Sequence, residues 1–203
     1  MHSGARAISR LMAVSALAAM IGVPTAAAAE ASGDPDAAVQ AGSANESADA
    51  DDAATTDGPA APVRRLSDTL IATMKDAKAL GFDGRRDRLA PVLRETFDFG
   101  FMAQLALGSQ WSQLDTDERA RFTELFGDMS VATFAARFDG YGGQRFEVQE
   151  PREGPRGTKL VPTKLVHPDS EKAPVTISYL VRKTDTDWQA VDVYLKGTYS
   201  ELA

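Results

Sequence analysis

Few side chains in this sequence have the type and spacing that catalysis would need. Asp115, Asp117 and Glu118 form a close group of carboxylates, and paired carboxylates can act as general acid and base. They stand just before a segment with helical spacing, where carboxylates cap a helix and interact favourably with its dipole. We therefore interpret this group as the start of a helix and not as a catalytic site.

Asp192 is the carboxylate whose surroundings could most change its chemistry. Apolar strand residues flank it, so it could lie in a low-dielectric pocket with a shifted pKa. Together with Tyr194 it could supply the acid, base or electrophilic group of a small pocket enzyme. A structural aspartate held by hydrogen bonds explains the same pattern more simply. We therefore expect no catalytic residue, and keep the pocket enzyme as an alternative.

Other reactive groups are scarce. The chain has no cysteine, and beyond residue 29 its one histidine is His167, in a His-Pro-Asp turn. These residues cannot build a zinc site rich in His or Cys, and a nucleophilic triad would depend on this single turn residue. The sequence predicts no metal site, no cofactor and no enzymatic activity.

The N-terminus has the pattern of a secretory signal peptide over residues 1–29. Arg6 and Arg10 make a basic region, residues 11–23 an apolar region, and Ala27 to Ala29 a small-residue cleavage site. An uncleaved anchor is the alternative, but the apolar region is shorter than the roughly 20 residues that a membrane-spanning helix needs. We expect export, with the periplasm as the simplest destination.

Residues 30–63 are rich in Ala and Asp and contain no aromatic and no basic residue. Such a composition buries too little apolar surface to offset chain entropy, so it predicts a disordered acidic linker. The formal charge is +2 over residues 1–29, -8 over 30–63 and -1 over 64–203. The remaining domain is almost neutral and lacks the basic excess of a nucleic-acid-binding protein.

The first half of the domain, residues 64–203, has helical spacing. We expect Asp83-Gly84 to turn the chain between the first two helices, Gly108 to end the third, and a long helix to follow Asp115. The apolar residues that recur three or four positions apart lie in 66–77, 89–97 and 101–106.

The second half of the domain has the alternation of antiparallel strands. Val191, Val193 and Leu195 would share one face of the last strand, opposite Ala190, Asp192 and Tyr194. The predicted strands are 146–150, 159–166, 175–183 and 188–195. The fold class is therefore α+β, with several N-terminal helices packed on a four-stranded antiparallel sheet.

The long helix has apolar residues on two sides. Phe122, Leu125, Phe126 and Met129 fall within one narrow arc, whereas Val131, Phe134 and Phe138 fall roughly opposite. Either the helix bends near residues 128–130, or its second half lies between two apolar partners, one of which could be a ligand. A helix clamped between the sheet and another helix fits the pattern equally well.

Several stretches together resemble the MlaC/toluene-tolerance family of periplasmic lipid-binding proteins. They are FDFGFMAQLALGSQW, LDTDERARFTELF and ISYLVRKTDTDWQAVDVYLKGTYSEL, and the runs SVATFAARFDGYGGQRFEV and DVYLKGTYSELA are most similar to its hopanoid-associated HpnM branch. The resemblance covers most of residues 66–203. It implies a lipid shuttle that carries phospholipid or hopanoid between the outer membrane, with its lipoprotein complex, and an inner-membrane ABC transporter complex.

The same resemblance implies an apolar pocket between the helices and the sheet. Each candidate lining residue, taken singly, also fits an ordinary core, so the set as a whole is the hypothesis. Carried over by position, the set is Phe97, Phe101, Met102, Leu105, Phe126, Met129, Phe134, Phe138, Ile177, Tyr179, Val181, Val191 and Val193.

The chain departs from the family pattern at its end. Members of the family continue past the last strand into a C-terminal helical segment, which this sequence does not show after Ser200. We expect the domain to lack that segment, which could weaken lipid binding. An interaction module without catalytic activity, with the two-sided helix as its docking surface, is the other alternative.

Overall fold

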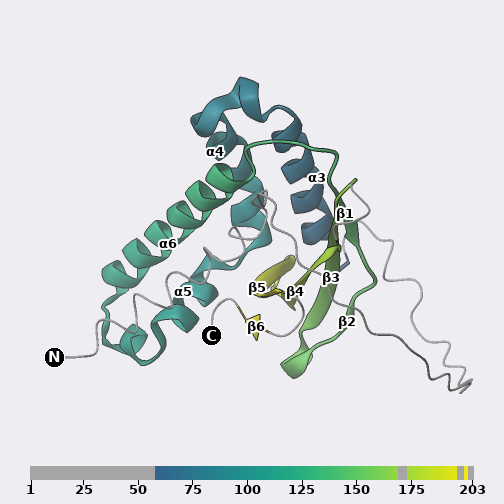
Figure 1. Ribbon diagram of the computed structural model, residues 1–203. Coiled ribbons are helices and arrows are strands. Elements are labelled where there is room, and N and C mark those ends of the chain that lie inside the picture. The colour runs from purple at the N-terminus through teal and green to yellow at the C-terminus, as the bar shows by residue number, and fades with distance from the viewer. Residues whose placement is uncertain (1–57, 169–172, 196–198, 201–203) are drawn as a thin grey trace, which may run out of the picture.

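The computed structural model describes residues 58–168, 173–195 and 199–200. The predicted signal peptide and residues 30–57 of the predicted linker lie outside the described residues. The chain forms helices α3 to α6 and a mixed-length antiparallel sheet, which confirms the α+β class (Figure 1). No helix within the described ranges is long and apolar enough to cross a membrane.

The first described helix, α3 (Ala61–Lys75), begins inside the range predicted as linker. Pro62 occupies the first helical turn, where its missing N–H costs no hydrogen bond, and Val63 is fully buried. The helix thus overlaps the last three residues of the predicted linker.

Helix α4 (Ala77–Thr96) is broken at Gly81. The sequence predicted the turn two residues later, at Asp83-Gly84. Gly81 has φ 62° and ψ -172°, a conformation that essentially only glycine adopts. The helix resumes after this break and contains Pro91. Its buried residues are Ala77, Leu89, Val92, Leu93 and Thr96.

Helix α5 (Phe99–Leu107) is followed by the short 3-10 helix η1 (Gly108–Gln113) and the long helix α6 (Thr116–Arg137). Gly108 ends α5 with φ 57°, as predicted. Asp115 and Glu118 form a reciprocal capping box, with both hydrogen bonds at 2.9 Å. The structure thus confirms the capping interpretation of these carboxylates.

The two apolar sides of α6 have separate partners. Phe126 contacts Phe99 of α5, whereas Phe134 contacts Phe97, just after α4. Leu125, which the spacing placed in the same arc as Phe126, is instead 57% exposed. Different helices therefore cover successive parts of one continuous helix, which explains a pattern that no single core would produce.

The sheet follows the order β1-β3-β4-β5-β6, all antiparallel, with β2 also paired to β3. The four predicted strands are present, and three of them match the prediction to the residue. Among the described residues the sheet also contains β2 and β6, which have only two residues each. The strands are β1 (Arg145–Val148), β2 (Arg152–Glu153), β3 (Lys159–Val166), β4 (Val175–Lys183), β5 (Trp188–Leu195) and β6 (Tyr199–Ser200), with the 3-10 helix η2 (Pro155–Gly157) after β2.

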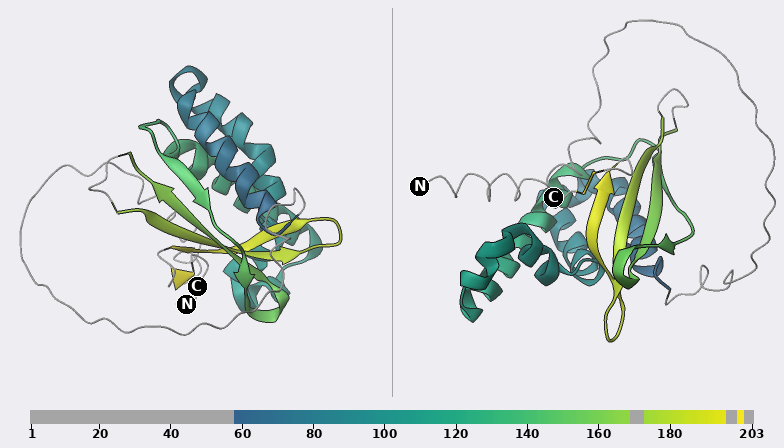
Figure 2. Two further views of the ribbon diagram at one scale, coloured as in Figure 1. Left: turned by 90° about the vertical axis from the view of Figure 1, so that its right-hand side faces the viewer. Right: turned by 90° about the horizontal axis from the view of Figure 1, so that it is seen from below.

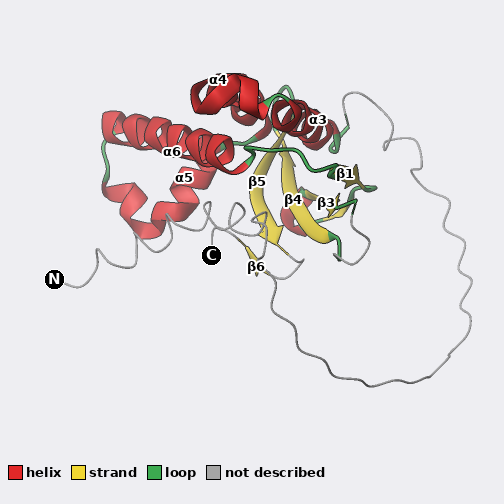
Figure 3. Ribbon diagram, turned by 45° about the horizontal axis from the view of Figure 1, so that its top comes forward, coloured by secondary structure: helices red, strands yellow, loops and turns green. Residues whose placement is uncertain are grey.

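The helices gather on one side of the sheet (Figure 3). Val161, Tyr179 and Val193 form one row across the three long strands and belong to the core with the helices. A register shift at Leu180/Val181 pairs Leu180 with Asp192 but Val181 with Ala190. Ala190 therefore lies on the helix side, where it also pairs with Phe97, and the predicted alternation of β5 is wrong there.

Candidate functional site

Helix α5, η1 and the first half of α6 extend past the sheet, and we call this unit the helical arm (residues 99–126). Figures 1 and 2 show the arm projecting sideways from the layered part of the domain. Its apolar side chains are unusually accessible: Leu105 is 42% exposed, and Phe101, Trp111 and Phe122 are only partly buried. Apolar surface gathered on one projecting unit is typical of a binding surface.

A continuous series of aromatic rings joins the arm to the sheet. Tyr179 of β4 lies 6.3 Å from Phe97, and Phe97 lies 5.8 Å from Phe99. Phe99 is 6.1 Å from Phe126, which stacks at 6.3 Å on the partly exposed Phe122. These centroid distances are those of favourable aromatic pairs. The series forms an apolar path from the buried face of the sheet to the accessible surface of the arm.

The thirteen predicted lining residues divide into buried and accessible groups. Leu105 is exposed, while Phe101 and Met129 are partly buried. The other ten are buried: Phe97, Met102, Phe126, Phe134, Phe138, Ile177, Tyr179, Val181, Val191 and Val193.

Val191 differs from the rest of this set. It is buried, but it lies outside the helix–sheet core cluster that holds its neighbours Ala190 and Val193. The register shift explains this, because Val191 has no partner residue on β4. Val191 therefore does not share the helix-facing side with Val193, as simple alternation predicted.

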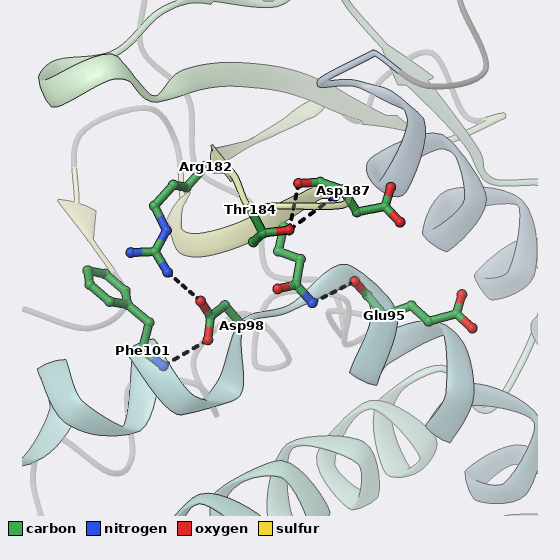
Figure 4. Close-up of polar contacts among 7 residues, drawn as sticks. Glu95, Asp98, Phe101, Arg182, Thr184 and Asp187 are labelled. Atoms are coloured by element: carbon green, nitrogen blue, oxygen red, sulfur yellow. Dashed lines mark hydrogen bonds and ion pairs between the residues drawn. The ribbon is translucent and has the colours of Figure 1, made fainter.

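A polar contact closes the junction between arm and sheet (Figure 4). Asp98, the N-cap residue of α5, accepts a hydrogen bond from the Phe101 N–H at 2.9 Å. Its other carboxylate oxygen receives Nη2 of Arg182 at 2.6 Å. The Arg182 guanidinium also lies over the Phe101 ring, 4.5 Å from its centroid. Sequence reasoning missed this group, since no local pattern relates positions so far apart.

The sheet face that turns away from the helices carries a second feature. A cavity of about 200 Å³ is lined by residues of the β2–η2 connection and of the three long strands. Asp192 and Tyr194 lie on this face, and the Tyr194 hydroxyl hydrogen-bonds the Asp192 carboxylate. Burial and this carboxylate raise the pKa of Tyr194. The lining residues are Glu153, Gly154, Pro155, Leu160, Ser178, Leu180 and Tyr194.

The structure thus brings together the two residues of the pocket-enzyme alternative. Asp192 is buried and also accepts a hydrogen bond from the Val193 N–H at 2.7 Å. A carboxylate held by a neighbouring tyrosine and a backbone N–H fits the simpler structural interpretation. Among the described residues, no three His, Cys, Asp or Glu side chains are grouped as metal ligands would be.

Comparisons with known proteins agree with the architecture. The family model described as MlaC protein matches residues 64–200. No curated protein matches the chain significantly. A solved structure of a phospholipid-binding protein from Ralstonia solanacearum, in complex with a phospholipid, is similar with a TM-score of 0.58 and 20% identity, covering 68% of this chain and 78% of that one. At this identity the similarity shows a shared fold. Because the family model spans well over half of the sequence, the chain belongs to the MlaC family.

Proposed function

We propose that this protein binds a lipid by its acyl chains and carries it across the periplasm, between the outer membrane and an inner-membrane ABC transporter complex. MlaC-family proteins are periplasmic, and the similar structure from Ralstonia solanacearum holds a phospholipid. Both observations favour a binding protein over an enzyme. Phospholipid is the ligand that they support, and hopanoid is the ligand that the HpnM-like stretches of the sequence favour.

One observation carries the proposal: apolar side chains continue without interruption from the sheet to the arm surface. Tyr179 and Phe97 are buried at one end of this path, and Phe122 is only partly buried at the other; Leu105 is exposed on the same arm. An acyl chain laid along such a path would gain about 0.8 kcal/mol for each CH₂ removed from water. The side chains at the arm–sheet junction would have to shift to admit it. Met102 and Met129, with three rotatable bonds each, are suited to that adjustment.

Native mass spectrometry of the protein, purified from periplasm without detergent, tests the proposal. We expect one lipid for each protein, released and identified by extraction. A phospholipid or a hopanoid would define the cargo. Recovery of folded protein without bound lipid would contradict lipid carriage.

A second candidate function uses the same surface. The exposed Leu105 and Leu125 could dock a protein partner, and the chain would then be an interaction module without cargo. Such a module would self-associate or bind its partner with no lipid present, and detergent would disrupt that association. The two functions are therefore distinguished by the lipid content of the purified protein.

A further inference from the structure

The turn between α3 and α4 forms a tip that projects away from the sheet. Figure 1 shows this tip at the top of the molecule, and Figure 2 shows the α3–α4 pair extending beyond the strands. We define the tip as residues 75–88. Phe82, in its centre, is 44% exposed, although a phenylalanine is usually buried. The tip lies at a different end of the molecule from the helical arm (Figure 1).

Two glycines build the conformation that leaves Phe82 exposed. Gly81 breaks α4 with φ 62° and ψ -172°, immediately before Phe82. Leu80 lies against Gly84, where an added Cβ would approach the Leu80 Cβ to 3.1 Å. The chain therefore covers Leu80 with its own backbone and presents Phe82 at the surface.

Arg85 anchors the tip to the rest of the domain. Its Nε donates to the carbonyl oxygen of Ala135 in α6 at 2.8 Å, and its Nη1 donates to the carbonyl oxygen of Ala77 at 3.1 Å. These bonds join both sides of the Gly81 break to the last turns of α6. The exposed ring is thus held on a fixed support.

The tip is basic although the domain is almost neutral. It contains five basic and three acidic residues, a net charge of +2. Arg86 pairs with both Asp83 and Asp87, and Arg88 pairs with Asp76 at 2.6 Å. All three carboxylates are therefore engaged by arginines.

Lys75 and Lys78 supply the remaining positive charge. Both are exposed, and neither forms an ion pair with another described residue. The Lys75 ammonium lies 5.3 Å from the ring centroid of Tyr141, a second aromatic residue that is 43% exposed. Two accessible aromatic rings and two uncompensated lysines therefore occupy one end of the molecule.

We propose that the tip is a docking surface for an anionic lipid bilayer. Aromatic rings favour the boundary between headgroups and acyl chains, and lysines are attracted to an anionic surface. A single inserted ring and two lysines give weak, reversible attachment. The proposal concerns a surface separate from the arm, so it does not depend on lipid carriage by the arm.

Sedimentation with vesicles tests the proposal on residues 30–203, the chain that follows the predicted signal peptide. We expect binding to vesicles of phosphatidylglycerol and phosphatidylcholine, weaker binding in raised salt, and little binding to pure phosphatidylcholine. The double change Lys75→Gln/Lys78→Gln should weaken binding about 25-fold, since one lysine near an anionic surface contributes roughly fivefold. Phe82→Ser should also weaken it. Tyr141→Phe should leave it unchanged, because the ring is kept.

Matched variants control for a general loss of positive charge or of exposed apolar surface. Lys164→Gln/Lys183→Gln removes the same charge from the sheet and should bind like the unchanged protein, as should Leu125→Ser on α6. The proposal would be overturned if the two double lysine variants lost vesicle binding equally. It would also be overturned if Leu125→Ser abolished vesicle binding while Phe82→Ser preserved it. Failure of the unchanged protein to bind anionic vesicles would also overturn it. Lipid content of each variant by native mass spectrometry reports separately on the arm.

Discussion

Arg182 on β4 and Asp98 at the start of α5 are 84 positions apart, yet Nη2 of one lies 2.6 Å from Oδ2 of the other. The contact joins the helical arm to the sheet at one point, and Asp98 also caps the arm's first helix. A single substitution can therefore remove one of the contacts that hold the arm against the sheet.

Removing this bond should loosen the arm. We expect Arg182→Ala to lower the free energy of unfolding by about 1–2 kcal/mol, because an ion pair and a cation–π contact are both lost. Asp98→Ala should cost a similar amount, since the ion pair and the helix cap are lost while Arg182 and the Phe101 ring are both kept. Urea denaturation measures both. Arg145→Ala, which breaks the surface pair with Glu147, is the control and should cost under about 0.5 kcal/mol. A larger loss in the control than in Arg182→Ala would contradict this account.

A charge on the accessible part of the predicted lipid path should reduce lipid retention without unfolding the protein. Leu105→Asp places a carboxylate on the exposed side of α5, where an acyl chain would otherwise lie. We expect at least a tenfold loss of retained lipid by native mass spectrometry. Gln104→Asp adds the same charge at the neighbouring exposed position and should retain lipid normally.

A charge placed at the buried end of the path should affect lipid retention more strongly. Val193→Asp or Tyr179→Asp should abolish lipid retention, with circular dichroism used to check that the variant is folded. A folded variant of either kind that still carries lipid would show that these residues do not line the site.

Tyr179 should make stability fall at high pH. Burial raises the pKa of its hydroxyl above the ordinary value of about 10, so the folded state keeps a proton that the unfolded state loses. The stabilisation is complete below pH 10 and declines above it, by up to about 1.4 kcal/mol for each pH unit. In urea denaturation, the free energy of unfolding of Tyr179→Phe should decline less steeply between pH 10 and 11 than that of the unchanged protein. Tyr194→Phe, which removes the other tyrosine with a raised pKa, is measured beside it for comparison. Parallel curves for Tyr179→Phe and the unchanged protein would refute this assignment.

Substitution of Gly81 should lower stability because of its backbone conformation and not because of a steric clash with neighbouring atoms. A Cβ at Gly81 would meet no atom within 4 Å, but its φ of 62° is unfavourable for any other residue. We expect Gly81→Ala to destabilise by about 1–3 kcal/mol in thermal unfolding. Gly140→Ala also enters open space but has no positive φ, so it should be neutral or slightly stabilising. Similar effects of the two changes would contradict a conformational cause.

Most of the local structure follows from residues that are close together in the chain. The strands 159–166, 175–183 and 188–195 were predicted to the residue, because alternating side chains and turn residues report directly on a strand and its ends. The capping box at Asp115 and the end of α5 at Gly108 are likewise decided by a few neighbouring residues. The MlaC-like pattern also predicted the family that the comparisons support.

Features that depend on distant partners follow only from the packing of the whole chain. The two-residue strands β2 and β6 exist only because β3 and β5 offer them hydrogen bonds, and the displacement of Val191 arises from pairing with β4. The Arg182–Asp98 contact and the cavity behind the sheet join residues that no local pattern relates. Backbone preferences are local, and the sequence reveals them, whereas burial, register and contact depend on how the whole chain folds.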